Sequence, residues 1–164
     1  MRDSRVQFLT RAAMIAAVYV VLVVLLALFS FKEVQVRVAE MLTILPFFTP
    51  AAVPGLFLGC IIGNAMGGAI LPDIVFGSLA TLAGAVGTYC LRGKNLIVAA
   101  IPPIAANTLV VPFVLKYAYG VNLPIPLLML TVGIGEVISC GVLGVMFGKV
   151  LKRYRHVLFD RNAA

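Results

Sequence analysis

The chain has 164 residues, of which 62% are hydrophobic and 12% are charged, and its formal net charge is +7 at pH 7. A soluble domain carries about 45–50% apolar and about 25% charged residues, so this composition excludes an ordinary soluble fold and predicts a single membrane domain over 1–164. The positive charge alone would suit a nucleic-acid partner, but its placement along the chain argues against that class.

Apolar segments of the length that a bilayer requires follow one another along the chain. The first is predicted as a helix over 8–31. We do not expect it to be a cleavable signal peptide, because no small-residue cleavage motif follows it. The next apolar region is too long for one helix, and prolines at positions 46, 50 and 54 divide it. The sequence therefore predicts an all-α bundle of six transmembrane helices, joined by short loops, over 8–31, 37–48, 52–70, 73–91, 96–117 and 126–151.

The basic residues predict how the bundle is oriented, because cytoplasmic loops carry an excess of Lys and Arg. With six crossings and both termini in the cytoplasm, ten of the thirteen basic residues lie on the inner side: Arg2, Arg5, Arg11, Arg92, Lys94, Lys149, Lys152, Arg153, Arg155 and Arg161. The other three, Lys32, Arg37 and Lys116, face outward. We expect the basic C-terminal run to contact lipid headgroups rather than nucleic acid.

Small residues recur at helical spacing in two of the predicted helices. Four glycines stand four residues apart, at positions 55, 59, 63 and 67, and so share one face of the helix over 52–70. In lipid, such a face lets another backbone approach closely, so we expect these glycines to pack inside the bundle. Near the cytoplasmic end of the first helix stand Ala12, Ala13, Ala16 and Ala17. Two interpretations of these alanines remain open, internal packing and docking of another membrane subunit.

Polar side chains of the predicted membrane zone collect in its outer half. On the topology above these are Gln35, Arg37, Glu40, Asn64, Asp73, Asn107 and Lys116, with Glu136 near the midplane. Polar groups inside a membrane are costly, so their clustering predicts a polar cavity that is open to the outside and closed below.

Most of these residues also have a structural interpretation. Arg37 and Glu40, three residues apart on one helix, can pair with each other. Asp73 follows a proline and can cap the helix that starts there. Asn64 and Asn107 can hydrogen-bond between helices, and Lys116 can extend its amine to the outer interface.

Glu136 is the polar residue that a structural interpretation explains least well. No basic residue stands three or four positions away from it. A carboxylate at mid-depth requires a proton, a cation or a ligand rich in hydrogen-bond donors. We therefore expect Glu136 to contact a ligand.

Motifs of known enzymes are missing from the chain. Around Lys94 the sequence has Thr88 and Asn95 where a Walker A motif requires Gly and Ser or Thr, so we expect no ATP hydrolysis by this chain. Neither an HExxH nor a GxSxG motif is present, and Cys60, Cys90 and Cys140 lack metal-site spacing, so we expect packing roles for the cysteines and neither a metal nor a cofactor in this chain. These features favour a solute-binding bundle that depends on partner proteins for energy.

Three segments resemble the signature of the QueT family. They are QVRVAEMLTILPFFTP over 35–50, PGLFLGC over 54–60 and DIVFGSLATL over 73–82. The resemblance implies the fold of an S component, the substrate-binding membrane subunit of an energy-coupling factor (ECF) transporter in the bacterial plasma membrane. It also implies the partners, which are one transmembrane coupling subunit and two ATPases that use the ATP. In such families an alanine motif in the first helix docks on the coupling subunit, which favours that role for Ala12, Ala13, Ala16 and Ala17.

The resemblance further implies a queuosine precursor such as preQ1, a 7-deazaguanine, as the solute. A carboxylate can accept both the ring N–H and the exocyclic amine of such a base. We expect Glu136 in that role, with Glu40 second, and Asp73 or Glu40 as the anion for the aminomethyl cation. The predicted solute-binding set is completed by Arg37, Asn64, Asn107 and Lys116, and by Phe76 as an aromatic that stacks, with Phe47, Tyr117 and Tyr119 as alternatives.

Two alternatives stay open on sequence grounds. One keeps the class and changes the solute to another vitamin or base, such as thiamine or riboflavin. The other is a membrane scaffold protein without a solute, in which the outer polar groups pair off with each other.

Overall fold

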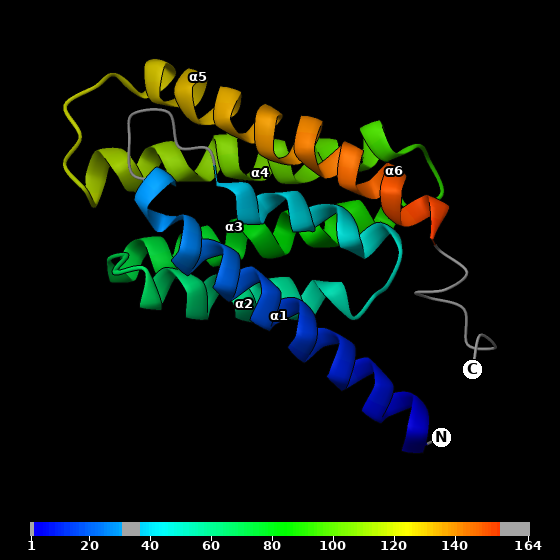
Figure 1. Ribbon diagram of the computed structural model, residues 1–164. Coiled ribbons are helices and arrows are strands. Elements are labelled where there is room, and N and C mark those ends of the chain that lie inside the picture. Colours follow the sequence, from blue (N-terminus) through cyan, green and yellow to red (C-terminus); the bar gives the residue numbers. More distant parts are fainter. Residues whose placement is uncertain (1, 31–36, 155–164) are drawn as a thin grey trace.

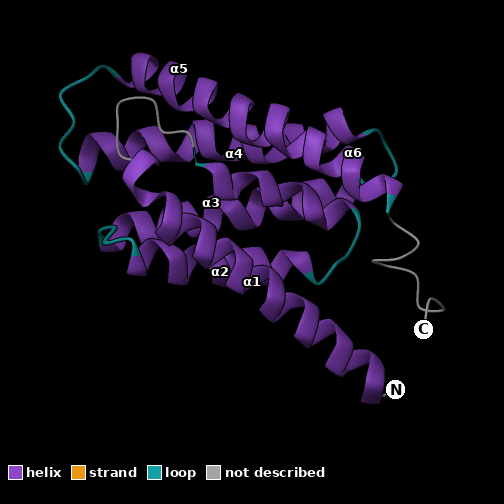
Figure 2. Ribbon diagram, in the orientation of Figure 1, coloured by secondary structure: helices purple, strands orange, loops and turns teal. Residues whose placement is uncertain are grey.

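A computed structural model describes residues 2–30 and 37–154, and the described residues are helical apart from short connections (Figure 2). The order is α1 (Arg2–Ser30), a 3₁₀ helix η1 (Val38–Phe47), α2 (Ala52–Met66), α3 (Leu71–Cys90), α4 (Leu96–Tyr117) and a last stretch of α5 (Ile125–Glu136), η2 (Val137–Gly144) and α6 (Val145–Arg153). The six helical stretches fall where the sequence predicted them, and the all-α class is confirmed.

Four of these stretches are long and apolar enough to cross a membrane, namely Ser4–Leu26, Leu71–Cys90, Leu96–Tyr117 and Ile125–Arg153. η1 and α2 are shorter, at 10 and 15 residues. The prediction of 52–70 for the third helix extends too far, because the chain turns at Gly68, whose φ of 79° lies in the left-handed region that ends helices. The chain is thus an all-α membrane protein, and the number of six crossings stays a prediction.

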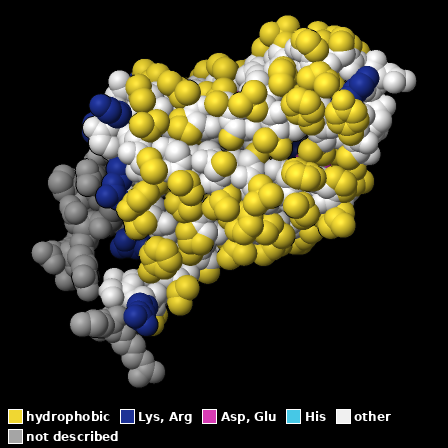
Figure 3. All heavy atoms as spheres, turned by 180° about the vertical axis from the view of Figure 1, so that it is seen from behind, with side chains coloured by type: hydrophobic (Ala, Val, Ile, Leu, Met, Phe, Trp, Pro, Cys, Tyr) yellow, Lys and Arg dark blue, Asp and Glu magenta, His cyan; other side chains and the backbone are white. Residues whose placement is uncertain are grey.

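The start of α1, the α3–α4 connection and the end of α6 lie at one end of the bundle (Figure 1). The described basic side chains on these segments are Arg5, Arg11, Arg92, Lys94, Lys149, Lys152 and Arg153. Figure 3 shows Lys and Arg side chains collecting at one end and hydrophobic side chains covering the flank of the molecule. We call this the basic end. Lys32, Arg155 and Arg161, which also served to orient the chain, lie outside the described residues.

Glycines of α2 pack directly on α1, as their spacing predicted. A Cβ added at Gly55 would lie 2.7 Å from the carbonyl oxygen of Ala12, and one at Gly59 would lie 2.9 Å from Cβ of Tyr19 and 3.1 Å from Cα of Ala16. The contact of these two glycines with α1 is named here the glycine seam. No side chain larger than hydrogen fits at either glycine unless α1 moves, so the seam fixes where Tyr19 lies.

The seam divides the alanine set of α1 into two pairs. Ala12 and Ala16 are buried against α2, whereas Ala13 and Ala17 are exposed. Internal packing therefore occupies the first pair, and only the second pair presents a surface to another protein. The prediction of four docking alanines is reduced to two.

η1 runs through the middle of the bundle, and nearly all of it is buried between α1, α3 and η2. The last stretch is α-helical except for η2, a π-helix, which begins one residue after Glu136 and contains Cys140. π-helical turns inside α-helices are often found at functional sites. Here the turn brings Gly144 against the backbone of η1, with a Cβ position 3.3 Å from the Met41 carbonyl oxygen.

Candidate solute-binding site

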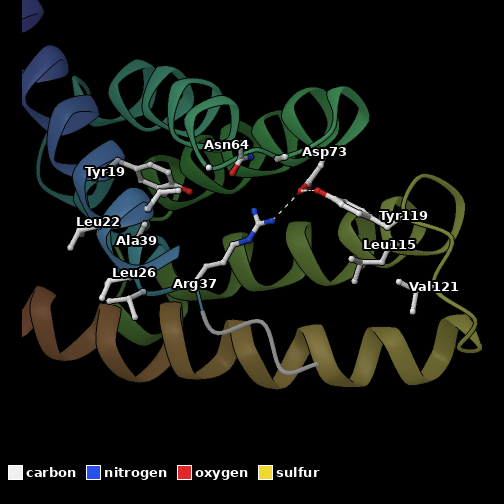
Figure 4. Close-up of a pocket in the computed structure, with 14 residues that line it drawn as sticks. Tyr19, Leu22, Leu26, Arg37, Ala39, Asn64, Asp73, Leu115, Tyr119 and Val121 are labelled. Carbon is white, nitrogen blue, oxygen red and sulfur yellow. Dashed lines mark hydrogen bonds and ion pairs between the residues drawn. The ribbon is translucent and has the colours of Figure 1, made fainter. Parts of the chain in front are cut away.

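A cavity of about 280 Å³ lies between helix ends that are opposite the basic end in Figure 1, and Figure 4 shows it in close-up. The later half of α1, the start of η1, the end of α2 with its connection to α3, the start of α3, the end of α4 and the α4–α5 connection supply its walls. Its lining residues are Tyr19, Leu22, Val23, Leu26, Arg37, Val38, Ala39, Asn64, Gly67, Ala69, Asp73, Leu115, Tyr119 and Val121. Apolar walls with a few convergent polar groups are typical of small-molecule sites.

Asp73 is the centre of the polar groups at this cavity. The Arg37 guanidinium donates to its Oδ2 over 3.3 Å, and the Tyr119 hydroxyl donates to the same oxygen over 3.0 Å. Figure 4 shows Arg37 and Tyr119 reaching this carboxylate from different sides. Asp73 is 3% exposed, and its Oδ1 has no hydrogen-bond partner among the described residues. We call Arg37, Asp73 and Tyr119 the cavity triad.

The triad overturns two structural interpretations of the sequence. Arg37 does not pair with Glu40 three residues on, but with Asp73 on another helix. Asp73 is not the N-cap of α3, since the cap position is Ile70 and makes no side-chain cap bond, while Asp73 lies inside the first turn. The carboxylate is thereby free to point into the bundle, and the positive end of the helix dipole favours its negative charge.

Tyr119 completes the triad from the α4–α5 connection. Besides donating to Asp73, its oxygen accepts from the backbone N–H of Ile70 over 3.4 Å. Burial, followed by the negative charge of Asp73, raises the pKa of the Tyr119 hydroxyl above its usual value, which keeps it in the form that donates. Tyr119 therefore ties the α4–α5 connection to the α2–α3 connection across the cavity.

Below the cavity lies a second cluster of polar side chains, in which Glu40 is the central acceptor. Glu40 is 1% exposed. The Tyr19 hydroxyl donates to its Oε1 over 2.5 Å, and Thr81 donates to the same oxygen over 3.4 Å. The Asn107 amide donates to Oε2 over 3.5 Å. Tyr19 lines the cavity and Glu40 does not, so the Tyr19 ring stands between the cavity and this carboxylate.

Glu136 extends this deeper group, and it is 4% exposed. Cys140, one turn further on, donates to its Oε2 over 3.3 Å. Cys140 thus has a polar role in addition to the packing role predicted for it, since Thr43 also donates to its sulfur over 3.3 Å. One carboxylate oxygen each of Glu40 and Glu136 and the sulfur of Cys140 lie within 4.8 Å of one another. We call Tyr19, Glu40, Thr81, Asn107, Glu136 and Cys140 the deep network.

The structure brings the predicted solute-binding residues together only in part. Arg37, Asn64 and Asp73 line the cavity, whereas Glu40, Asn107 and Glu136 belong to the deep network behind it. Phe76 is 53% exposed on the surface of α3, and neither Phe76 nor Lys116 is among the lining residues. Of the alternative aromatics, Tyr119 lines the cavity and Tyr117 is exposed.

Tyr19 is the lining residue that sequence reasoning missed. Its only signal was a single phenol in an otherwise apolar helix, and the tyrosine of such a helix more often lies at a membrane interface. Its hydroxyl could not be assigned to Glu40 without knowing that the glycine seam draws this part of α1 against the bundle.

Comparison with known proteins relates the sequence of this chain to one family. The family model described as QueT transporter matches residues 9–153. A curated protein named queuosine precursor transporter QueT, from Lactococcus lactis subsp. cremoris (strain MG1363), is 32% identical over 84 residues. That alignment covers 50% of this chain and 49% of the relative, so it spans about half the length of either protein. No solved structure matches the chain.

The match to the family model covers most of the chain, including the helices that form the glycine seam, the cavity and the deep network. With several apolar helices long enough to span a membrane, the protein is a multi-pass protein of the bacterial cell membrane. Because the family model matches residues 9–153, the chain belongs to the QueT transporter family.

Proposed function

We propose that this protein is the substrate-binding S component of an ECF-type importer and that it takes up a queuosine precursor of the preQ1 type. The observation that carries the proposal is the cavity with its triad of Arg37, Asp73 and Tyr119, open at the end of the bundle away from the basic end. A volume of about 280 Å³ suits a single small heterocycle, and the lining offers an anion, a cation, an amide and two phenols.

The proposal includes an orientation. If the basic end lies in the cytoplasm, as the distribution of Lys and Arg favours, the cavity opens to the outside. Six crossings with both termini inside are compatible with the positions of the connections along the bundle (Figure 1). A solute would then be captured from outside the cell.

The proposed solute contacts begin with the lining residues Arg37, Asn64 and Asp73. An amide both donates and accepts, so Asn64 can read the edge of a base, and the phenol of Tyr19 or Tyr119 can stack on it. Glu40, Asn107 and Glu136 lie one layer behind. They position Tyr19, and they reach the solute only if that ring moves.

The test is binding of purified protein in lipid nanodiscs, measured by calorimetry. The panel contains preQ1, its nitrile analogue preQ0, guanine, thiamine and riboflavin. We expect submicromolar binding of a deazapurine and none of thiamine or riboflavin. If one of the two vitamins binds and no deazapurine does, the proposal of an S component is retained and the proposed solute is wrong. If no member binds, the solute-binding function itself is contradicted.

The proposed partner is a module of one coupling subunit and two ATPases, docked on the exposed side of α1 where Ala13 and Ala17 lie. Replacing Ala17 by Phe is expected to abolish co-purification of the module with the protein and to leave solute binding intact. Val86→Phe, at a position 45% exposed on α3, is the matched control that should still co-purify. Equal co-purification of both variants would contradict docking at this site.

A further inference from the structure

Asp73 is the carboxylate among the described residues that line the cavity, and its two oxygens differ. Oδ2 accepts from both Arg37 and Tyr119, whereas Oδ1 is buried and accepts from no described residue. A buried charged acceptor without a donor is destabilising, so such a group at a cavity is expected to receive a donor when the site is filled. The carboxylate has capacity for one more donor without giving up those it holds.

The neighbouring backbone leaves room beside that oxygen. Position 77 is a glycine, and a Cβ added there would lie 3.1 Å from Oδ1 of Asp73 and 3.5 Å from Nδ2 of Asn64. A larger side chain at this position would therefore press on the carboxylate. Asn64 and Asp73, both lining residues, face this small space from α2 and α3.

The described lining of the cavity suits a hydrogen-bond donor on the solute better than an acceptor. Arg37 already donates to Asp73, and Oδ1 of Asp73 is a buried acceptor to which no described residue donates. A cationic group on the solute would find an acceptor there, whereas an anion would compete with Asp73 for Arg37.

We infer that Asp73 binds a positively charged arm of the solute and thereby selects a cationic solute over a neutral one of the same shape. The inference rests on the proposed function, because it concerns the same cavity. For a 7-deazaguanine solute, the arm is the aminomethyl group of preQ1, an ammonium near neutral pH. preQ0 carries an uncharged nitrile at the same ring position. Arg37 and Tyr119 then act as positioning residues that hold Asp73 in place for the arm.

The test compares the affinities for preQ1 and preQ0 in three proteins, the wild type, Asp73→Asn and Glu40→Gln. The wild type is expected to favour preQ1 by at least about tenfold, since hydrogen bonds to charged groups contribute about 1.5–3 kcal/mol. Asp73→Asn removes the charge and keeps the shape, so it should lower preQ1 affinity by at least about tenfold and change preQ0 affinity by less than about threefold. Glu40→Gln is matched in chemistry but lies outside the cavity, and it should preserve the preQ1 preference.

Three outcomes overturn the inference. The first is a wild type that binds both solutes equally. The second is an Asp73→Asn protein that loses both affinities to the same extent, as a purely structural role would produce. The third is a Glu40→Gln protein that loses the preference for preQ1 as Asp73→Asn does. The charge of the aminomethyl group would then interact with the buried carboxylates as a set and not with Asp73 in particular. If Asp73→Asn does not fold, the ratio of the preQ1 and preQ0 affinities of the wild type still decides whether the site selects a cationic solute. A wild type that binds neither solute contradicts the proposed function instead.

Discussion

The cavity triad and the deep network use similar side chains in different ways. In the deep network, Glu40 receives donors on both carboxylate oxygens, from Tyr19, Thr81 and Asn107, and is closed off from the cavity. In the triad, Asp73 receives two donors on one oxygen and none from the described residues on the other, and it lines the cavity.

This difference teaches which buried carboxylate is expected to act on a solute. A buried acceptor whose hydrogen bonds are complete rigidifies the structure, whereas one with unused capacity is prepared for a partner that comes later. The deep network also joins α1, η1, α3 and α4, so it holds the helices that carry the triad. The predictions below test this division, from the largest expected effect to the smallest.

The largest effect is expected from Glu40→Ala. The change removes the Glu40 acceptor of Tyr19, Thr81 and Asn107, and although Thr81 can still donate to the Cys60 sulfur over 3.5 Å, the Tyr19 hydroxyl loses its partner and a cavity is left in the buried core. Each buried unpaired group costs about 1–3 kcal/mol, so the free energy of unfolding should fall by about 3 kcal/mol or more. Thermal unfolding in detergent measures it.

Glu40→Gln keeps one acceptor oxygen and serves as the control, with a smaller loss. Asp73→Asn keeps an oxygen that can accept from Arg37 and Tyr119 but loses the charge of the ion pair, so it should be destabilised, and by less than Glu40→Ala because Arg37 is only half-buried. If Glu40→Ala and Asp73→Asn shift the unfolding temperature equally, the division between the two polar regions is wrong.

Gly55→Ala should lower the free energy of unfolding by less than Glu40→Ala does, but by a measurable amount. Its Cβ would lie 2.7 Å from the Ala12 carbonyl oxygen, so α1 must move. Overpacking costs about 1–3 kcal/mol, and the helix preference for Ala over Gly returns about 0.5–1 kcal/mol. The net destabilisation should be about 1 kcal/mol, read from the same unfolding curves. Gly93→Ala, where a Cβ meets nothing within 4 Å, is the control that should be neutral; a neutral Gly55→Ala would show that α1 is not held at the seam.

Gly77→Ala is expected to affect binding more than stability. The added methyl group would lie 3.1 Å from Oδ1 of Asp73, tighter than ordinary contact, and would press on the oxygen that we assign to the solute. A loss of several-fold in preQ1 affinity, about 1 kcal/mol, is expected by calorimetry. Gly133→Ala, whose Cβ would meet only Thr108 at 3.4 Å, is the helical control. Unchanged preQ1 affinity in Gly77→Ala would remove Oδ1 from the site.

Much of the fold could be predicted from the sequence because a lipid bilayer permits few kinds of backbone structure. Apolar length located the helices, the prolines between 46 and 54 marked the interruption around η1, and the four-residue spacing of glycines predicted the packing of α2. These are local signals, and each needs only one segment of chain to be read. The irregular π-helical turn after Glu136 left no such signal, since no proline or repeated pattern marks it.

The site could be predicted only as a set of polar residues, not as contacts. One structural interpretation paired Arg37 with its own-helix neighbour Glu40, yet it pairs with Asp73, 36 positions along the chain. Spacing along one helix cannot show which residue of another helix comes closer. The main ligand role was assigned to Glu136 from its depth and from the lack of a basic residue three or four positions away, and this reasoning has the same limit. In the folded chain its carboxylate lies in the deep network, where Cys140 donates to it.

The smallest effect is expected from Phe76→Ala, and it tests the boundary of the site. Phe76 stands one position before Gly77 on α3, but its ring is 53% exposed on the outer surface of the helix. A residue adjacent in sequence is turned by about 100° on a helix, so Phe76 faces lipid while Gly77 faces Asp73. Removing the ring should change preQ1 affinity by less than about twofold, within about 0.4 kcal/mol. A loss as large as that of Gly77→Ala would mean that the aromatic wall of the site is on α3, and that the cavity beside Tyr19 and Tyr119 is not where the base stacks.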